Sequence, residues 1–296
     1  MSISGSPLGD ELFQSSSRLK NINATTLPKP ARTRIISVSN QKGGVGKTTS
    51  TVNLAASLAA KGLKVMVIDL DPQGNASTAL GIEHGEGTLG VYEVLIEGAE
   101  IKDAVQVSPE NPNLSCIPAT IDLAGAEIEI VTSFERENWH ALLKSAIDAY
   151  LAENQGLDYI FIDCPPSLGL LTVNAFVAAT EVLLPIQCEY YALEGLSQLL
   201  RNIERIQVAL NPQLVLSTIL LTMYDSRTKL ASAVVDDVRH HFPVQTLNAV
   251  IPRNVRVSEA PSFGRTVISH DKSSVGSLAY LEAAIEIAQK GAQNGR

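Results

Sequence analysis

The chain has 296 residues, with 23 Lys and Arg against 31 Asp and Glu, which gives a formal net charge of −8. Hydrophobic residues make up 45% and charged residues 18%, and these proportions exclude a mostly disordered chain, a collagen and a coiled coil. The three cysteines include no CxxC pair, so we expect neither a disulfide scaffold nor a thiolate metal site, and we place the protein in the cytoplasm. No apolar run approaches the ~20 residues that a membrane span needs.

The first 33 residues differ in composition from the rest of the chain. They mix Ser, Asn, Thr and Pro with scattered apolar residues, which is typical of a flexible tail. We therefore predict a tail over residues 1–33 and one domain over residues 34–296. The tail is too short for a helix-turn-helix domain, so sequence-specific DNA binding is not expected.

Buried strands alternate with helices along the remaining chain. Strands are expected at 34–39, 64–69, 159–163, 182–186 and 215–221, with a weaker candidate at 244–250. Helices are expected at 48–61, 89–96, 123–131, 134–151 and 277–290, with further helical stretches between the later strands. The near-continuous apolar strands predict an α/β fold: a single doubly wound, mostly parallel sheet with helices on both faces.

Charge is distributed unevenly along this domain. Residues 83–137 hold twelve acidic and two basic side chains, whereas residues 222–272 hold seven basic and five acidic ones. An acidic chain can therefore still present a locally basic face.

A glycine-rich loop connects the first predicted strand to the helix over 48–61. It reads Gln41-Lys42-Gly43-Gly44-Val45-Gly46-Lys47-Thr48-Thr49. Glycines allow backbone N–H groups to point into one concavity, and the helix N-terminus adds a positive dipole end. The pattern predicts an ATP-binding loop in which Lys47 contacts the β- and γ-phosphates and the Thr48 hydroxyl binds Mg²⁺.

Two aspartates follow predicted strands at the edge where parallel sheets bind ligands. Asp71 lies in the loop after the second strand, and its carboxylate has the chemistry to hold a water in line with the γ-phosphate. Asp163 ends a hydrophobic strand and precedes Cys164-Pro165-Pro166. This is the Walker B arrangement, in which the carboxylate holds Mg²⁺ directly or through water.

The glycine loop departs from the general phosphate-loop pattern, because Gln41 stands where the first glycine is expected and Lys42 follows it. The run from Lys42 to Thr49 resembles the deviant Walker A motif of the ParA/MinD ATPase family. Asp71–Asn75 and Asp163–Pro166 resemble its two switch loops. The resemblance implies that Lys42 reaches across an ATP-dependent homodimer to the partner's nucleotide. It also implies that Asp71 orients the attacking water and that Lys42, Lys47 and Asp71 together serve hydrolysis.

The late segments 221–228, 251–256 and 258–262 resemble the chromosomal ParA/Soj branch of this family. By this resemblance, Pro252 and Asn254 lie at the adenine. Arg227 and Arg256 match arginines that bind DNA non-specifically in the ATP dimer.

The resemblance implies a weak ATP hydrolase that is stimulated by a ParB-type centromere-binding protein and is associated with the nucleoid. Two alternatives remain: a positioning ATPase of the same fold for another cargo, and a nucleotide-gated scaffold with negligible turnover. No membrane attachment is expected, because the last helix contains Glu282 and Glu286 and lacks a bulky apolar stripe.

Overall fold

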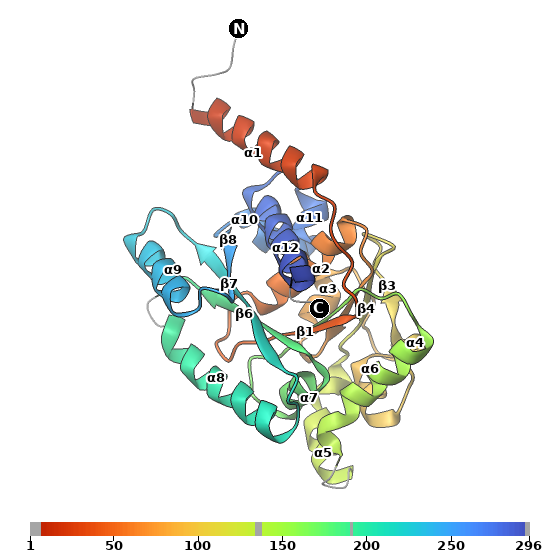
Figure 1. Cartoon of the computed structure of the whole chain (residues 1–296). Coiled ribbons are helices and arrows are strands. Elements are labelled where there is room, and N and C mark those ends of the chain that lie inside the picture. The colour runs from red at the N-terminus through yellow and green to blue at the C-terminus, as the bar shows by residue number, and fades with distance from the viewer. Residues whose placement is uncertain (1–6, 134–137, 190–191, 294–296) are drawn as a thin grey trace.

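The computed structural model describes residues 7–133, 138–189 and 192–293. Within these ranges one eight-stranded sheet has the order β3-β4-β2-β5-β1-β6-β7-β8, and every neighbouring pair except β3–β4 is parallel (Figure 1). The strands are β1 Arg34–Val38, β2 Val65–Asp69, β3 Gln106–Val107, β4 Leu114–Ile117, β5 Tyr159–Asp163, β6 Glu181–Gln187, β7 Val215–Tyr224 and β8 Thr246–Pro252. The predicted mostly parallel sheet is confirmed.

Helices cover both faces of the sheet. The α-helices are α1 Pro7–Ala24, α2 Lys47–Ala60, α3 Asn75–Ala79, α4 Ile101–Ala104, α5 Ala126–Ser133, α6 Leu142–Glu153, α7 Leu170–Ala178, α8 Ala192–Ala209, α9 Lys229–His241, α10 Val255–Glu259, α11 Val267–His270 and α12 Val275–Gln293. One core cluster packs α2 and α12 on the sheet, and a second packs α6, α7 and α8 on the other face (Figure 1). No helix in the described ranges combines the length and apolar character of a membrane span.

Strand β5 shows why the central strands are continuous apolar runs in the sequence. Tyr159 and Phe161 belong to the core cluster of α2 and α12, whereas Ile160 and Ile162 belong to the cluster of α6, α7 and α8. All five residues of the strand are buried. Because helices cover both faces, the usual alternation of apolar and polar residues is absent.

The N-terminal segment corrects the prediction of a flexible tail, because it contains helix α1. The Arg18 guanidinium makes two hydrogen bonds, of 2.8 and 2.7 Å, to the Glu282 carboxylate on α12. Ile22 and Leu27 are buried in the core cluster of α2 and α12. The Lys61 ammonium donates to the Ile22 carbonyl at 2.8 Å, at the end of the helix. These contacts are made with residues far along the chain, so local composition does not reveal them.

Three predicted helices also differ in detail. The helix expected over 89–96 is instead a π-helical segment, η1, at Glu93–Glu97. The helix expected over 123–131 is divided between a 3₁₀ turn, η2 (Ile121–Ala124), and α5. The helix expected over 134–151 lies partly outside the described residues, and α6 begins only after a 3₁₀ turn, η3 (Trp139–Ala141). The last 3₁₀ turn, η4, covers Ala260–Phe263.

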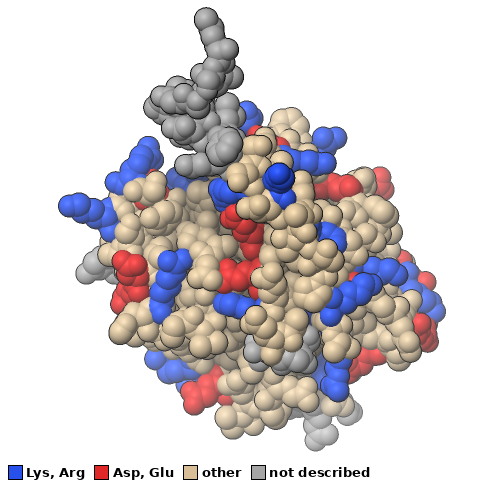
Figure 2. All heavy atoms as spheres, turned by 45° about the horizontal axis from the view of Figure 1, so that its top comes forward, with Lys and Arg blue, Asp and Glu red and all other residues tan. Residues whose placement is uncertain are grey.

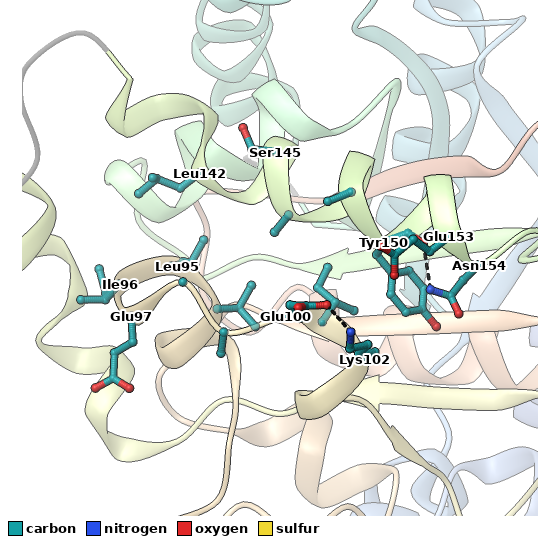
Figure 3. A pocket seen from close by; sticks show the side chains of 16 residues that line it. Leu95, Ile96, Glu97, Glu100, Lys102, Leu142, Ser145, Tyr150, Glu153 and Asn154 are labelled. Atoms are coloured by element: carbon teal, nitrogen blue, oxygen red, sulfur yellow. Dashed lines mark hydrogen bonds and ion pairs between the residues drawn. The ribbon is translucent and has the colours of Figure 1, made fainter.

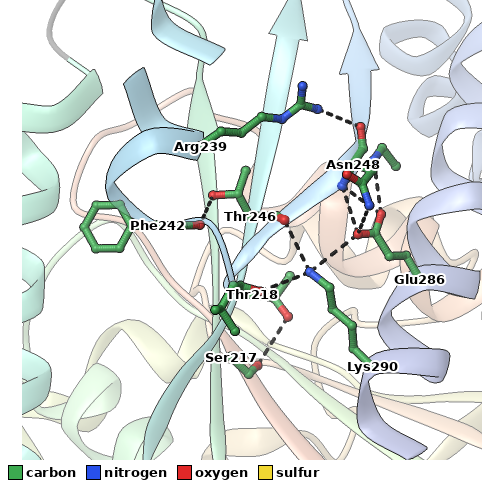
Figure 4. A network of polar contacts seen from close by, with 10 residues as sticks. Ser217, Thr218, Arg239, Phe242, Thr246, Asn248, Glu286 and Lys290 are labelled. Carbon is green, nitrogen blue, oxygen red and sulfur yellow. Dashed lines mark hydrogen bonds and ion pairs between the residues drawn. The ribbon is translucent and has the colours of Figure 1, made fainter. Parts of the chain in front are cut away.

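Strand β8 lies at the end of the sheet and is tied to α12 by polar side chains (Figure 4). The Glu286 carboxylate accepts hydrogen bonds from the backbone N–H groups of Asn248 at 2.9 Å and Ala249 at 3.1 Å. The Lys290 ammonium donates to the Thr246 carbonyl at 3.2 Å. Groups on an exposed edge can pair with another strand, so these side chains protect the edge.

Candidate nucleotide-binding site

The sheet topology brings the predicted nucleotide-binding segments to one edge. Strands β2, β5, β1, β6, β7 and β8 are neighbours and run parallel. Their carboxyl ends therefore meet. The glycine loop follows β1, the Asp71 loop follows β2, and Asp163 ends β5. Ligands of open parallel sheets bind at this edge.

The glycine loop has the backbone that phosphate binding needs. Gly44 and Gly46 have φ angles of 74° and 87°, in the left-handed region that favours glycine. Gly46 is also the N-cap residue of α2, and no side chain caps this helix. The N–H groups of its first turn, which includes Lys47, Thr48 and Thr49, therefore receive no side-chain cap and suit an anion.

The two lysines of the loop lie in different surroundings. Lys47 is 7% exposed, its ammonium donates to the Lys42 carbonyl at 3.2 Å, and burial lowers its pKa. The Lys42 side chain extends to the surface, where its ammonium lies 3.2 Å from the Glu189 carboxylate. The Lys47 side chain therefore lies inside the loop, whereas the Lys42 side chain lies on its surface.

Asp163 is brought together with two hydroxyls of α2. Thr48 Oγ1 donates to Asp163 Oδ2 at 2.7 Å, and Thr51 Oγ1 donates to Asp163 Oδ1 at 2.9 Å. The Asp163 side chain is fully buried, and burial raises its pKa, with the nearby Asp69 carboxylate adding to the effect. A buried carboxylate without a cation is costly.

These residues fit Mg²⁺, which prefers oxygen ligands. Thr48 and Asp163 would supply a hydroxyl and a carboxylate from adjacent elements. The described residues contain no group of three or more His, Cys, Asp or Glu side chains that could hold a metal ion. Mg²⁺ bound here would therefore complete its coordination with phosphate oxygens and water, as is usual for Mg²⁺.

Hydrogen bonds of Asp69, the residue two positions before Asp71, connect this loop to helix α3. The buried Asp69 carboxylate accepts from the Ser77 backbone N–H at 2.8 Å and from its hydroxyl at 2.6 Å. Asp71 is 8% exposed and accepts from the Gln73 N–H at 3.1 Å. The negative charge of Asp71 also acts on Lys47, where it raises the pKa against the lowering by burial, so the two side chains lie in the same part of the site.

Strands β7 and β8 extend the site toward Pro252 and Asn254. The Thr222 hydroxyl donates to the Val45 carbonyl of the glycine loop at 2.8 Å. Tyr224 of the same strand pairs with Pro252 of β8. Asn254 is the N-cap residue of α10. These contacts place Pro252 and Asn254 at the edge that carries the glycine loop, whereas their adenine contact stays a prediction.

Arg227 and Arg256 follow the carboxyl ends of adjacent strands and are both exposed. The Arg227 side chain, 84% exposed, pairs with Asp225 at 2.7 Å. Arg256 lies 3.2 Å from Glu259 and 3.6 Å from Asp271. Figure 2 shows one face of the molecule on which basic and acidic side chains are interspersed. Both arginines are therefore accessible, but neighbouring carboxylates partly neutralise them.

Some contacts of the site were not predicted from the sequence. Thr51 lies three residues after Thr48 and thus on the same helix face, which is a signal that could have revealed it. Glu189 and Thr222 carry no comparable signal, because their partners in the glycine loop are far away in the chain.

A glycine loop that leads into a helix with no side-chain cap, beside a threonine–aspartate pair, is typical of P-loop nucleotide-binding proteins. Residues 33–216 match the family described as an AAA domain. The solved structure of cobyrinic acid a,c-diamide synthase from Mycobacterium smegmatis with ADP and magnesium is 36% identical, with a TM-score of 0.74, over 90% of this chain and 97% of that one. The MinD structure from Pyrococcus horikoshii with Mg-ADP is 25% identical, with a TM-score of 0.66, over 86% and 95% of the two chains.

Proteins of similar sequence identify the family within this class of nucleotide-binding proteins. The sporulation initiation inhibitor protein Soj of Bacillus subtilis is 50% identical over 87% of this chain and 99% of its own. The chromosome partitioning protein ParA of Caulobacter vibrioides is 50% identical over 86% of this chain and 93% of its own. The chromosome-partitioning ATPase Soj of Treponema pallidum is 47% identical over 86% and 96%. The chain belongs to the Soj/ParA family of partition ATPases, which confirms the resemblance and supports ATP hydrolysis.

Proposed function

We propose that this chain is an ATP-dependent chromosome partition ATPase that dimerises on ATP, binds DNA non-specifically in that state and releases it after hydrolysis. A ParB-type centromere-binding protein would stimulate its weak turnover. The observation that carries the proposal is the pairing of Thr48 and Asp163 at the start of a helix with no side-chain cap. The supporting finding is the 50% identity to Soj and ParA proteins over most of the chain.

In this mechanism the loop residues hold the triphosphate. The N–H groups at the start of α2 and the Lys47 ammonium bind the β- and γ-phosphates. Thr48 and Asp163 would hold Mg²⁺, which would supply positive charge to neutralise the phosphate oxygens. Asp71 holds the attacking water in line with the γ-phosphate. The Lys42 side chain extends from the loop to the surface, where it would serve a nucleotide bound by a second copy of the chain.

DNA binding follows from pairing two chains. Each chain contributes Arg227 and Arg256, so the dimer doubles the number of arginines that can contact phosphates. Exposed ion pairs contribute little stability, so DNA phosphates can replace the carboxylates that neutralise these arginines. Backbone contacts carry no base information, and binding should be sequence-independent.

The test is steady-state phosphate release with and without DNA and the ParB-type partner. Slow turnover that rises when both are added supports a partition ATPase. Negligible turnover under every condition contradicts the proposal and favours a nucleotide-gated scaffold. Turnover that responds to neither addition favours a positioning ATPase for another cargo.

A further inference from the structure

A pocket lies away from the nucleotide-binding edge, between η1, α4 and α6. Its volume is about 530 Å³, within the range of about 300–1,000 Å³ typical of ligand sites. Figure 3 shows apolar side chains, among them Leu95 and Leu142, facing it from both sides, with Glu97, Glu100 and Glu153 near its rim. The pocket therefore combines an apolar interior with an acidic border.

The border keeps an excess of negative charge. Lys102 is its only cation among the lining residues and lies 2.5 Å from Glu100. Glu97 and Glu153 are not in direct ion-pair contact with any described residue, although the charge of Glu153 acts on Lys102 and helps to raise its pKa. Both are exposed, and η1 and α4 lie in the segment 83–137 that holds twelve acidic and two basic side chains. Such a border repels DNA and attracts cationic groups.

We propose that this pocket is the docking site for a short basic amphipathic segment of the centromere-binding partner. The inference rests on the proposed function and adds the place and chemistry of contact. Apolar side chains at helical spacing would enter the pocket between η1 and α6, as in helix-in-groove recognition. Lysines or arginines of the same segment would pair with Glu97 and Glu153.

Hydrogen bonds connect the residue before η1 to α5, and α5 to the first turn of α7. Tyr92, directly before η1, donates its hydroxyl to the Glu129 carboxylate on α5 at 2.9 Å. Glu127, on the same helix, accepts from the Leu171 N–H at 3.2 Å. Leu171 is in the first turn of α7, shortly after Asp163. A segment that displaces η1 would therefore act through α5 on the start of α7 and on the loop between Asp163 and that helix, and by this route binding would raise turnover.

Helix α6 offers matched variants. Ala149 and Ala152 are both exposed on this helix, but only Ala149 lines the pocket. Ala149→Trp fills the pocket, and Ala152→Trp adds the same bulk outside it. Glu153→Lys reverses a charge at the border, and Asp148→Lys makes the same reversal away from it. None of the four positions touches the nucleotide-binding residues, so basal turnover and thermal unfolding of the full chain control for folding.

The probes are the purified partner and labelled synthetic peptides that cover its lysine- and arginine-rich segments. We expect Ala149→Trp and Glu153→Lys to weaken peptide binding, measured by fluorescence anisotropy, by about tenfold or more, because blocking one anchor has effects of this size. Ala152→Trp and Asp148→Lys should bind like wild type. Tyr92→Phe should retain peptide binding and lose most of the stimulation of turnover.

The outcomes separate the two proposals. If the partner stimulates the wild type and all four α6 variants bind and respond equally, the docking site is wrong and the proposed function stands. If peptides bind normally to Tyr92→Phe and it is fully stimulated, the route through Glu129 is wrong. If the partner neither binds nor stimulates the wild type, both the docking site and the partner assignment of the proposed function are wrong.

Discussion

The ammonium of Lys42 lies 3.2 Å from the carboxylate of Glu189, on the surface beside the glycine loop. Both side chains are about half exposed, at 46% and 47%, so Lys42 can leave this pair at small cost. Lys42→Ala should therefore leave ATP binding intact and lower turnover by about 10²–10³-fold, the usual effect of losing one group that stabilises transition-state charge. Steady-state phosphate release and ATP titration measure the two effects.

Glu189→Gln is the matched control, because it removes the charge that holds Lys42 without removing Lys42. Its turnover should stay close to that of wild type. Wild-type turnover in Lys42→Ala would show that this lysine serves no nucleotide, its own or a partner's.

The Thr48 hydroxyl should be needed for the effect of Mg²⁺ on ATP binding. Thr48→Val keeps the size of the side chain but removes the oxygen that would bind the metal. Calorimetric ATP titrations with Mg²⁺ and with EDTA should differ for wild type and coincide for Thr48→Val. Thr51→Val removes the hydrogen bonds of this hydroxyl to Asp163 and to the Lys47 carbonyl but no proposed metal ligand, and it should keep part of the difference. A full Mg²⁺ effect in Thr48→Val would exclude Thr48 as a ligand.

The variant Gly43→Val should bind ATP but fail to dimerise. A Cβ atom added at Gly43 would meet no other atom of the chain within 4 Å, so Gly43→Val should fold normally. In the proposed dimer two glycine loops face each other, and the valine would clash with the partner. Light scattering after size exclusion should find a monomer for Gly43→Val in ATP. A dimer of this variant would rule out the facing geometry.

Helix α1 should contribute to stability and not to hydrolysis. Ile22 is 3% exposed, so Ile22→Ala should lower the free energy of unfolding by about 2 kcal/mol, the lower end of the range for a buried isoleucine. Deleting residues 1–30 removes this contact and the Arg18–Glu282 pair, yet it leaves the glycine loop unchanged. Urea unfolding and phosphate release test both parts. Turnover lost in the deletion while the chain stays folded would show a functional role for α1.

Much of the fold could be predicted because its central strands are buried on both faces. The run at 159–163 is continuously apolar for that reason, and its final aspartate marks the edge where ligands bind. The glycine loop could be recognised because its residues act through a local backbone shape. The roles of Lys47 and Thr48 were predicted from this local pattern, whereas the role of Asp71 rests on the resemblance to the ParA/MinD family, and all three roles stay predictions.

The features of the fold and site that were not predicted depend on contacts between distant parts of the chain. Helix α1 has the composition of a tail, and it is held by Glu282, which lies 264 residues after Arg18. Glu189 reaches Lys42 across 147 residues. The short strands β3 and β4 have too few residues to show a periodic pattern. No local signal in the sequence specifies these relationships.

In the proposed cycle, ATP assembles a dimer that binds DNA. Asp71→Ala should keep the protein in the ATP-bound dimer. Loss of the residue that positions the water lowers hydrolysis by about 10²-fold while ATP still binds. Within this background, Arg227→Glu and Arg256→Glu should remove DNA binding and spare the dimer. The logarithm of the affinity should fall with the logarithm of salt concentration, with a slope near −0.9 per phosphate neutralised.

The most direct measurement is a titration of Asp71→Ala with DNA of unrelated sequences, by interferometry, in ATP, in ADP and without nucleotide. We expect binding in ATP alone, of similar strength for every sequence, and none after either charge reversal. Equal binding without nucleotide, or an affinity unchanged by both reversals, would show that ATP does not assemble a DNA-binding dimer of this kind.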